Sequence, residues 1–321
     1  MAEKAAMSAL AMSQYKELQA SIGAGIDPTS SAPLPDCVAR DATPEDVTAA
    51  ASIVYTAFRQ MADRHAVFNF TSQSLEHATS IVASCVDRKD VITKVATAGD
   101  EIMGFVASTP ISEYLYDLGP IAVNIEKQAG GIGRALVQAA VRCARGTTTL
   151  TVDTYNAQAL ALYCRCGFDS YGTLAVCERT RLTPKDPAAY PGLVVRRAKT
   201  SDLHACIKLA DHYANTAMER EIQAHAETAW VVTQDDVVLG YCAALDMSGH
   251  SVFSMTLAAE ALLGAAAPDL ERPMVCVQLD QHPSFARWMF ENGWRVVKTL
   301  LLMSTKPLPE AMPGAVVLPR C

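Results

Sequence analysis

The sequence lacks any apolar run of the roughly 18 residues that a membrane-spanning helix needs. It also lacks a cluster of Lys and Arg, and its formal net charge is −7. A surface that binds nucleic acid needs a basic patch, so we expect neither nucleic acid nor a membrane as a partner. Charged residues make up only 19% of the chain and hydrophobic residues 50%, which leaves ample material for packed cores.

The cysteines and histidines lack the spacing of metal or redox sites. The closest pair of the ten cysteines, Cys164 and Cys166, has one residue between its members, which fits neither a zinc knuckle nor a redox pair. The seven histidines are dispersed, so we expect no metal site. We expect buried or idle thiols in a reducing compartment. Lys16 and Glu17 interrupt the apolar residues of the N-terminus, which argues against a signal peptide, and we expect a cytoplasmic protein.

A proline-rich stretch divides the chain. "TPKDPAAYPG" has three prolines within ten residues, a composition that stops both helices and strands. The predicted boundaries, in chain order, are 1–36 for an N-terminal tail, 37–182 for a first domain, 183–192 for a linker, 193–308 for a second domain and 309–321 for a C-terminal tail.

The two predicted domains resemble each other at both ends. "RDATPEDV" from Arg40 resembles "RRAKTSDL" from Arg196, and "ALYCRCGF" ending at Phe168 resembles "RWMFENGW" ending at Trp294. The second copy is the shorter one. We interpret this pattern as a duplication followed by shortening of the second copy.

Helix and strand patterns alternate in the first domain. Apolar residues recur at helical spacing over 47–61 and 74–86, and two strand-like runs flank Gly99 and Asp100, which predicts a hairpin. Further strand, helix, strand and helix patterns follow between 115 and 166. The sequence therefore predicts an α/β fold built around a mixed sheet.

A turn with three glycines lies between a predicted strand and a predicted helix, in "IAVNIEKQAGGIGRALV". A Walker loop would need a lysine that is absent, and a dinucleotide fingerprint fails because its third glycine falls on Leu136. The pattern Q-x-x-G-x-G fits at Gln128, Gly131 and Gly133. Glycines there let the backbone approach a diphosphate, and the start of the next helix attracts the same anion.

This segment resembles the cofactor motif of the GNAT superfamily of acyl-CoA-dependent N-acyltransferases. "VDTYNAQALALYCRCGF" is similar to the family's second characteristic segment, although Ile125 stands where a proline is frequent. The resemblance implies tandem GNAT folds, with an intact acyl-CoA site in the first and a shortened second, and acetyl-CoA as co-substrate. The residues that it assigns to the cofactor are Ala122, Val123, Gln128, Ala129, Gly130, Gly131, Ile132, Gly133, Arg134 and Asn156.

The resemblance also implies a catalytic acid. Free thiols titrate near ~8.5 and phenols near ~10, so a tyrosine can protonate the leaving thiolate without ionising at neutral pH. Tyr163 stands where the family places such a residue, although it could equally be an aromatic of the core. Asn156 could hold the pantetheine arm, cap its helix, or do both.

The general base is less well defined by the sequence. Asp117 lies eleven residues before Gln128, a spacing at which some family members carry a catalytic carboxylate. A solvated carboxylate is the alternative for this residue. Glu113, Tyr114 and Tyr116 are equally placed to line an acceptor pocket.

The second domain keeps the sequence pattern at both ends of the first domain but lacks the residues of its predicted site. Nothing between 241 and 280 fits Q-x-x-G-x-G. Aligning Gly293 with Gly167 places Met289 at the position of Tyr163, and methionine cannot protonate a thiolate; His282 falls at the position of Asn156. We therefore predict a catalytically silent second domain.

Two functions stay open at this point. The first is an N-acetyltransferase that moves an acetyl group from acetyl-CoA to a primary amine, on a small molecule or a side chain, by direct attack in a ternary complex. The second is a non-catalytic module that binds acyl-CoA for regulation. The acidic balance suits a cationic acceptor, and the sequence predicts no oligomeric state.

Overall fold

The computed structural model describes residues 38–67, 70–128, 130–179, 190–214, 219–246, 249–266, 273–308 and 315–319. All of these belong to one compact unit, Asp36–Cys321. The predicted tail 1–36 and most of the predicted linker 183–192 lie outside the described residues.

The two halves of the chain repeat one order of helices and strands, up to β6 in the first half and β12 in the second. The first half contains β1 (Val38–Asp41), η1 (Pro44–Asp46), α2 (Val47–His65), η2 (Phe70–Ser72), α3 (Leu75–Asp87), β2 (Ile92–Ala98), β3 (Glu101–Pro110), β4 (Leu115–Val123), η3 (Ile125–Lys127), α4 (Ile132–Cys143), β5 (Thr147–Asp153), α5 (Ala157–Arg165) and β6 (Asp169–Arg179). The second half contains β7 (Val194–Arg197), η5 (Thr200–Asp202), α6 (Leu203–Ala214), α7 (Glu219–Ala224), β8 (Trp230–Gln234), β9 (Val237–Cys242), β10 (Ser251–Phe253), α8 (Thr256–Ala266), β11 (Met274–Gln278), α9 (Pro283–Glu291), β12 (Trp294–Ser304) and β13 (Val316–Leu318).

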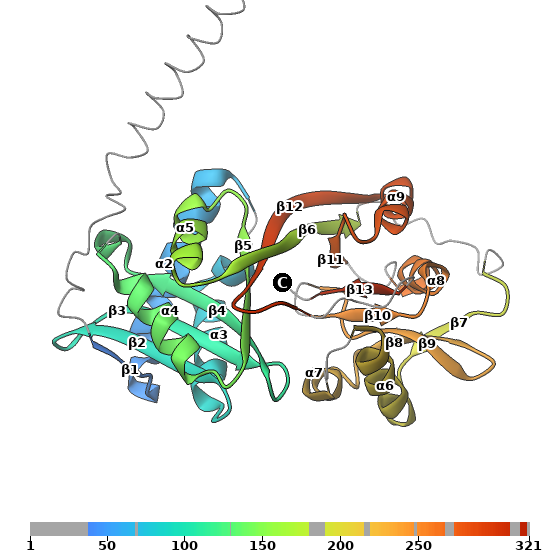
Figure 1. Cartoon of the computed structure of the whole chain (residues 1–321), viewed down its shortest axis with the longest axis horizontal. Helices are drawn as coiled ribbons and strands as arrows, with labels where there is room; N and C mark the ends of the chain where they lie inside the picture. Colours follow the sequence, from blue (N-terminus) through green and yellow to red (C-terminus); the bar gives the residue numbers. More distant parts are fainter. Residues whose placement is uncertain are drawn as a thin grey trace, which may run out of the picture. The chain divides into compact units, whose positions relative to one another are not determined.

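The strands form two sheets that do not follow the predicted division of the chain. Eight strands pair in the order β1-β2-β3-β4-β5-β12-β6-β11, and five pair in the order β13-β10-β9-β8-β7. The predicted α/β class with a mixed sheet is thus confirmed. β12, from the second half, lies between β5 and β6 of the first half, and β6 lies between β12 and β11 (Figure 1). Each half therefore contributes a strand to the pairing of the other.

The β6–β12 pair relates equivalent residues of the two halves. Leu174 on β6 pairs with Leu300 on β12. Gly167 follows α5 with a φ of +87°, and Gly293 follows α9 with a φ of +85°. Both glycines adopt the left-handed conformation that ends a helix. This geometry explains why the sequences before β6 and β12 resemble each other.

An equivalent Arg–Asp ion pair lies at the start of each half. Arg40 on β1 contacts Asp46 at 2.7 Å, and Arg196 on β7 contacts Asp202 at 2.6 Å. Each carboxylate also accepts a hydrogen bond from the backbone N–H three residues before it. The neighbouring guanidinium lowers the pKa of each Asp below its usual range. The segments that begin at Arg40 and Arg196 therefore resemble each other because both form this ion pair.

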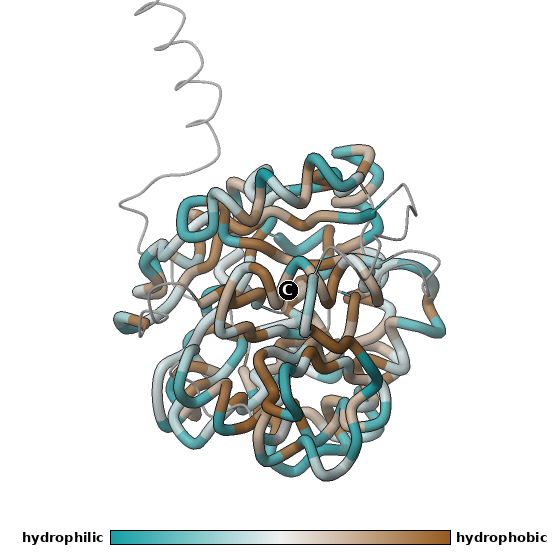
Figure 2. The backbone as a smooth tube through the Cα atoms, turned by 90° about the vertical axis from the view of Figure 1, so that its right-hand side faces the viewer, coloured by the Kyte–Doolittle hydropathy of each residue, from teal (hydrophilic) through white to brown (hydrophobic). Residues whose placement is uncertain are grey.

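Two apolar cores cover the two faces of the first-half sheet. Leu136, Leu150 and Tyr163 belong to the core beneath α4 and α5, whereas Val54 and Phe105 belong to the core beneath α2 and α3. Figure 2 shows hydrophobic segments concentrated inside the fold, with hydrophilic turns at its periphery. The first-half sheet is consequently held from both sides.

Two sequence expectations differ from the structure at the cysteines and at the C-terminal tail. Cys276 on β11 is disulfide-bonded, so the expectation of idle thiols throughout the chain is wrong, although seven other described cysteines are free. Residues 316–318, within the predicted tail 309–321, form β13. None of the described helices is both long and apolar enough to cross a bilayer. A cytoplasmic location stays a prediction.

Candidate active site

β4 and β5 pair at one end and separate at the other. Their parallel pairing covers Leu115 to Asp117 on β4 and Thr147 to Thr149 on β5. β4 then continues to Val123, and no described strand pairs with residues 118–123 on the side that faces β5. We call this stretch the β4–β5 opening.

A bulge in β4 accompanies the opening. The β3–β4 register shifts between Val106 and Ser108, so that Gly119 and Pro120 together lie opposite a single β3 residue. An extra residue in one strand bends that strand and increases its local twist. Gly119 and Pro120 thus interrupt the regular pairing of β3 with β4.

Alternation along β4 determines which peptide groups face the opening. The residue after the strand, Asn124, donates its N–H to the Met103 carbonyl of β3 at 2.8 Å. Because successive peptide groups point to opposite sides of a strand, those of Ile121 and Val123 face the opening. The peptide group of Ala122 faces β3, and its side chain is buried. Ile121 and Val123 thus present N–H groups to the opening, Val123 at the end nearer the glycine turn, and Ala122 packs in the core between them.

The glycine turn begins α4 close to the end of β4. Gly131 is the N-cap of α4 with a φ of +82°, a conformation that residues with a Cβ adopt rarely. A Cβ added at Gly133 would lie 3.1 Å from Leu162 Cδ2 of α5, so this glycine also permits close packing of the two helices. The first N–H groups of α4 have no acceptor within the helix and carry its positive dipole end. The turn can therefore receive an anion.

The remaining residues of the predicted cradle lie around this turn. Gln128 Nε2 donates to the Val123 carbonyl at 3.4 Å, which brings that side chain back onto β4. Ile132 is buried in the core beneath α4 and anchors the start of the helix. The exposed members are Gln128, Gly130 and Arg134. Ala129 lies outside the described residues.

Tyr163 lies on α5 within the core that adjoins the opening. Its side chain is 6% exposed, and its ring centroid is 5.9 Å from that of Phe168. Burial raises the pKa of Tyr163 above its ordinary value. The phenol therefore stays protonated at neutral pH and can act as a hydrogen donor. Its role as catalytic acid stays a prediction, and its position equally suits a residue of the core.

Asn156 caps α5. Its side-chain oxygen accepts a hydrogen bond from the Ala159 N–H at 3.1 Å. This is the capping role expected from the sequence. The side-chain amide nitrogen can still donate to a second group, so a contact with a cofactor is compatible with the cap.

Asp117 lies at the apex of the opening, at the last paired position of β4 and β5, opposite Thr149. Its side chain is partly buried and interacts with other groups. Of the three neighbours considered with it, Tyr116 is buried, Tyr114 is 65% exposed, and Glu113 is exposed beside Tyr114. The structure thus brings Asp117 to the opening and leaves Tyr114 on the surface.

Four polar residues beside the opening were not predicted. Asp153 at the end of β5 contacts Lys298 of β12 at 2.9 Å. Tyr155 follows in the β5–α5 loop and stacks on His65 of α2, with ring centroids 4.4 Å apart. Burial, with the nearby Asp153 carboxylate, raises the pKa of Tyr155. In the sequence, only its position next to Asn156 could have drawn attention to Tyr155. The contact of Asp153 with Lys298 could not be predicted, because it depends on β12 lying beside β5.

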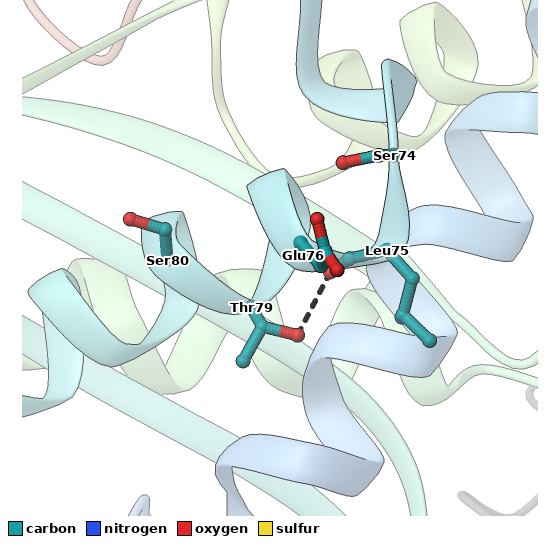
Figure 3. Close-up of a pocket in the computed structure, with 5 residues that line it drawn as sticks. All are labelled: Ser74, Leu75, Glu76, Thr79 and Ser80. Carbon is teal, nitrogen blue, oxygen red and sulfur yellow. Dashed lines mark hydrogen bonds between the residues drawn. The ribbon is translucent and has the colours of Figure 1, made fainter.

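A separate hollow on the protein surface lies at the start of α3. It is lined by Ser74, Leu75, Glu76, Thr79 and Ser80 (Figure 3). Ser74 Oγ accepts from the His77 N–H at 3.0 Å as an N-cap, and Thr79 Oγ1 donates to the Leu75 carbonyl at 2.8 Å. These polar groups complete the first turns of one helix, so we place the candidate site at the β4–β5 opening.

Among the described residues, no group of three or more His, Cys, Asp or Glu side chains could hold a metal ion. The candidate site therefore consists of backbone N–H groups, a buried phenol and carboxylates.

Residues 57–168 match the Acetyltransferase (GNAT) family. The match runs from α2 to the residue before β6, and it includes the glycine turn, Asn156 and Tyr163. This segment, about a third of the chain, is similar to the GNAT acetyltransferase family. No curated protein sequence matches the chain.

Solved structures extend the likeness over both halves. A protein from Pyrococcus horikoshii that is assigned as an acetyltransferase is 16% identical, with a TM-score of 0.66 over 88% of this chain and 92% of its own. A GCN5-related N-acetyltransferase from Sphaerobacter thermophilus is 15% identical, with a TM-score of 0.60 over 86% of this chain and 98% of its own. A glucosamine N-acetyltransferase region of a fungal multi-domain β-N-acetylglucosaminidase is 14% identical, with a TM-score of 0.57 over 85% of this chain and 38% of its own. These likenesses show a shared fold, in agreement with the tandem arrangement.

Proposed function

We propose that this chain transfers an acetyl group from acetyl-CoA to a primary amine, by direct attack while both substrates are bound. The observation that carries the proposal is the β4–β5 opening, which joins an unpaired strand edge at Val123 to the glycine turn that begins α4. A pantetheine arm has amide groups that can pair with such an edge as an additional strand would. A diphosphate matches the N-terminal N–H groups of α4.

Each site residue has one task in this proposal. The N–H groups of residues 130–134 bind the diphosphate, and Gln128 holds the turn against β4. Val123 donates its N–H to the thioester carbonyl and stabilises the charge that develops on that oxygen. Asn156 donates its free amide hydrogen atoms to the pantetheine arm.

The proton transfers follow from the chemistry of the reacting groups. The neutral amine forms the new carbon–nitrogen bond as the carbon–sulfur bond breaks, and the leaving thiolate needs a proton. Tyr163 holds a proton at neutral pH, as a phenol of ordinary pKa does, and burial raises its pKa further. Asp117, at the apex of the opening, accepts the proton that the attacking nitrogen loses, directly or through water.

The acceptor is proposed as a cationic amine. The formal net charge of −7 favours the approach of a cation. One structural neighbour is a glucosamine N-acetyltransferase region, so an amino sugar belongs among the amines to be tested. Neither nucleic acid nor a membrane is part of the proposal.

The test measures the release of CoA thiol with a panel that includes glucosamine, spermidine and a lysine peptide. We expect transfer to at least one amine. Tyr163→Phe keeps the ring and its packing and removes the proton donor, so kcat should fall by about 10²-fold or more. Its dissociation constant for acetyl-CoA should stay within about twofold of the wild-type value.

Two outcomes would count against the proposal in different ways. Binding of acetyl-CoA without transfer to any amine would favour the non-catalytic binding module. An equal kcat for the wild type and Tyr163→Phe would remove Tyr163 from the mechanism and leave it as a residue of the core.

A further inference from the structure

The second half contains a counterpart of the β4–β5 opening. Val123 pairs with Gly104 of β3, and Phe253 pairs with Gly240 of β9 in the same way. In both halves the residue that follows the strand donates its N–H to the neighbouring strand at 2.8 Å. Phe253 therefore stands where Val123 stands in the first half, and its peptide group faces away from β9.

β13 lies at this counterpart position. It pairs antiparallel with β10, with Val316 opposite Phe253 and Leu318 opposite Ser251. β13 also contacts β11, which is the counterpart of β5, and Figure 1 shows β13 beside both strands. A protein strand thus lies where, in the first half, β4 and β5 stay unpaired.

The residue equivalent to Asn156 contacts this strand. His282 is the N-cap of α9, as Asn156 is the N-cap of α5. The Val317 N–H of β13 donates to His282 Nε2 at 3.4 Å. Burial lowers the pKa of His282, so the ring is neutral and one of its nitrogen atoms can accept a hydrogen bond. The N-cap side chain of the second half therefore interacts with the strand at the counterpart position.

The second half lacks the connection that forms the diphosphate cradle of the first half. Residues 124–131 connect β4 to α4, whereas only Ser254 and Met255 connect β10 to α8. Met255 and Leu257 at the start of α8 are exposed, whereas most of the residues that follow are buried. The buried ones are Ala258, Ala259, Ala261, Leu262, Leu263, Gly264 and Ala266. An anion bound at the start of this helix would lack the glycine turn that serves α4.

We propose that β13 is a built-in occupant of the second half's cofactor position, where it takes the place that the pantetheine arm takes in the first half. This inference rests on the proposed function, because that function identifies the first opening as the acyl-CoA site. Val316 and Leu318 are each 1% exposed, and their burial retains the strand. The chain consequently has one acyl-CoA site, and its second position is closed by its own C-terminal segment.

The first measurement is the stoichiometry of CoA binding to the full chain by calorimetry. We expect one CoA for each chain. Two CoA molecules for each chain would overturn the inference, because the second position would then be open.

The second measurement is amide hydrogen exchange in the full chain without CoA. The N–H groups of Ser251 and Phe253 should be protected by β13. Val317→Pro removes the N–H that donates to His282 and fixes the backbone φ in the middle of β13, so exchange at Ser251 and Phe253 should rise at least tenfold. Val317→Ala keeps the backbone N–H and serves as the matched control, with exchange expected to stay within about threefold of the wild type.

The outcomes separate this inference from the proposed function. One CoA for each chain with protected β10 amides supports both. Protected amides without any CoA binding overturn the proposed function and leave β13 as a strand that closes the position. Equal exchange at Ser251 and Phe253 in the wild type and Val317→Pro overturns the inference, whatever the wild-type chain binds. Should Val317→Pro not fold, rapid exchange at these two amides in the wild type alone would overturn it.

Discussion

The two counterpart positions of the molecule differ in one connection and one strand. In the first half, a glycine turn within residues 124–131 connects β4 to α4, and one edge of β4 pairs with no described strand beyond Asp117. In the second half, two residues join β10 to α8, and β13 pairs with the equivalent edge. The comparison shows that the backbone N–H and C=O groups at a strand edge need a hydrogen-bonding partner. A ligand can supply it, and so can the chain itself.

The same comparison shows that the two halves are not independent. β12 pairs with β5 over Ser304 to Leu300 and with β6 over nearly its whole length. The contact of Lys298 with Asp153 places a residue of the second half beside the candidate site of the first. The second half therefore contributes a strand and an ion pair to the first-half sheet, although it lacks the glycine turn itself.

The largest expected effect comes from separating the halves. A chain that ends at residue 182 should not fold, because β5 loses its neighbour β12 and β6 loses both of its neighbours, β12 and β11. Circular dichroism and amide dispersion in NMR spectra should show an unfolded or aggregated fragment. Co-expression with residues 183–321 should restore the folded state. A monomeric 1–182 fragment with dispersed amide signals would contradict the shared sheet.

The next effect tests the glycine turn, which only the first half has. Gly131→Ala places a Cβ on a residue with a φ of +82°, at a cost of about 1–2 kcal/mol, and shifts the N–H groups of the turn. CoA affinity measured by calorimetry should fall about tenfold or more. Gly99→Ala is the matched control, since Gly99 has a φ of +59° in the β2–β3 hairpin. It should lower the melting temperature to a similar extent and leave CoA affinity unchanged; an equal loss of affinity in both variants would assign the effect to general strain.

The smallest effect tests the ion pair that both halves share. The folded pKa of Asp46 and of Asp202 is lowered by the neighbouring Arg, so each pair stabilises the fold above the unfolded pKa of about 3.9. That contribution is lost as the pH falls through the folded pKa. Arg40→Met and Arg196→Met should each lower stability by about 0.5–1 kcal/mol at pH 7, because both arginines are partly exposed and screened by solvent.

Urea unfolding at several pH values checks this expectation. The difference between each variant and the wild type should shrink as the pH falls below about 4. Equal effects in the two halves would support the conclusion that the same kind of ion pair stabilises both. A difference that does not change with pH would show that packing of the arginine side chain, rather than its charge, carries the effect.

Local patterns predicted much of the first half. The hairpin at Gly99, the helix that begins after Gly131 and the cap at Asn156 depend on residues close in sequence, and the structure contains all three. The repeat was also visible, since Arg40 and Arg196 stand at equivalent positions. The chemical roles of Tyr163 and Asp117 stay predictions that the kinetic experiment must test.

Other features escaped the sequence because they join distant segments. The contact of Asp153 with Lys298 depends on β12 lying beside β5. β13 lies in a segment expected to be a tail, and its three residues carry too short a pattern to specify a partner strand. Which peptide group of β4 faces the opening also depends on register, which a one-residue shift would reverse.

Glycine positions, helix caps and the alternation of helices with strands were determined by the sequence alone, because each depends on backbone preferences of a few neighbouring residues. The exchange of β6 and β12 and the pairing of β13 with β10 were decided only by the tertiary structure. Strand edges are satisfied by whichever segment the whole fold brings beside them, and no local pattern records that choice.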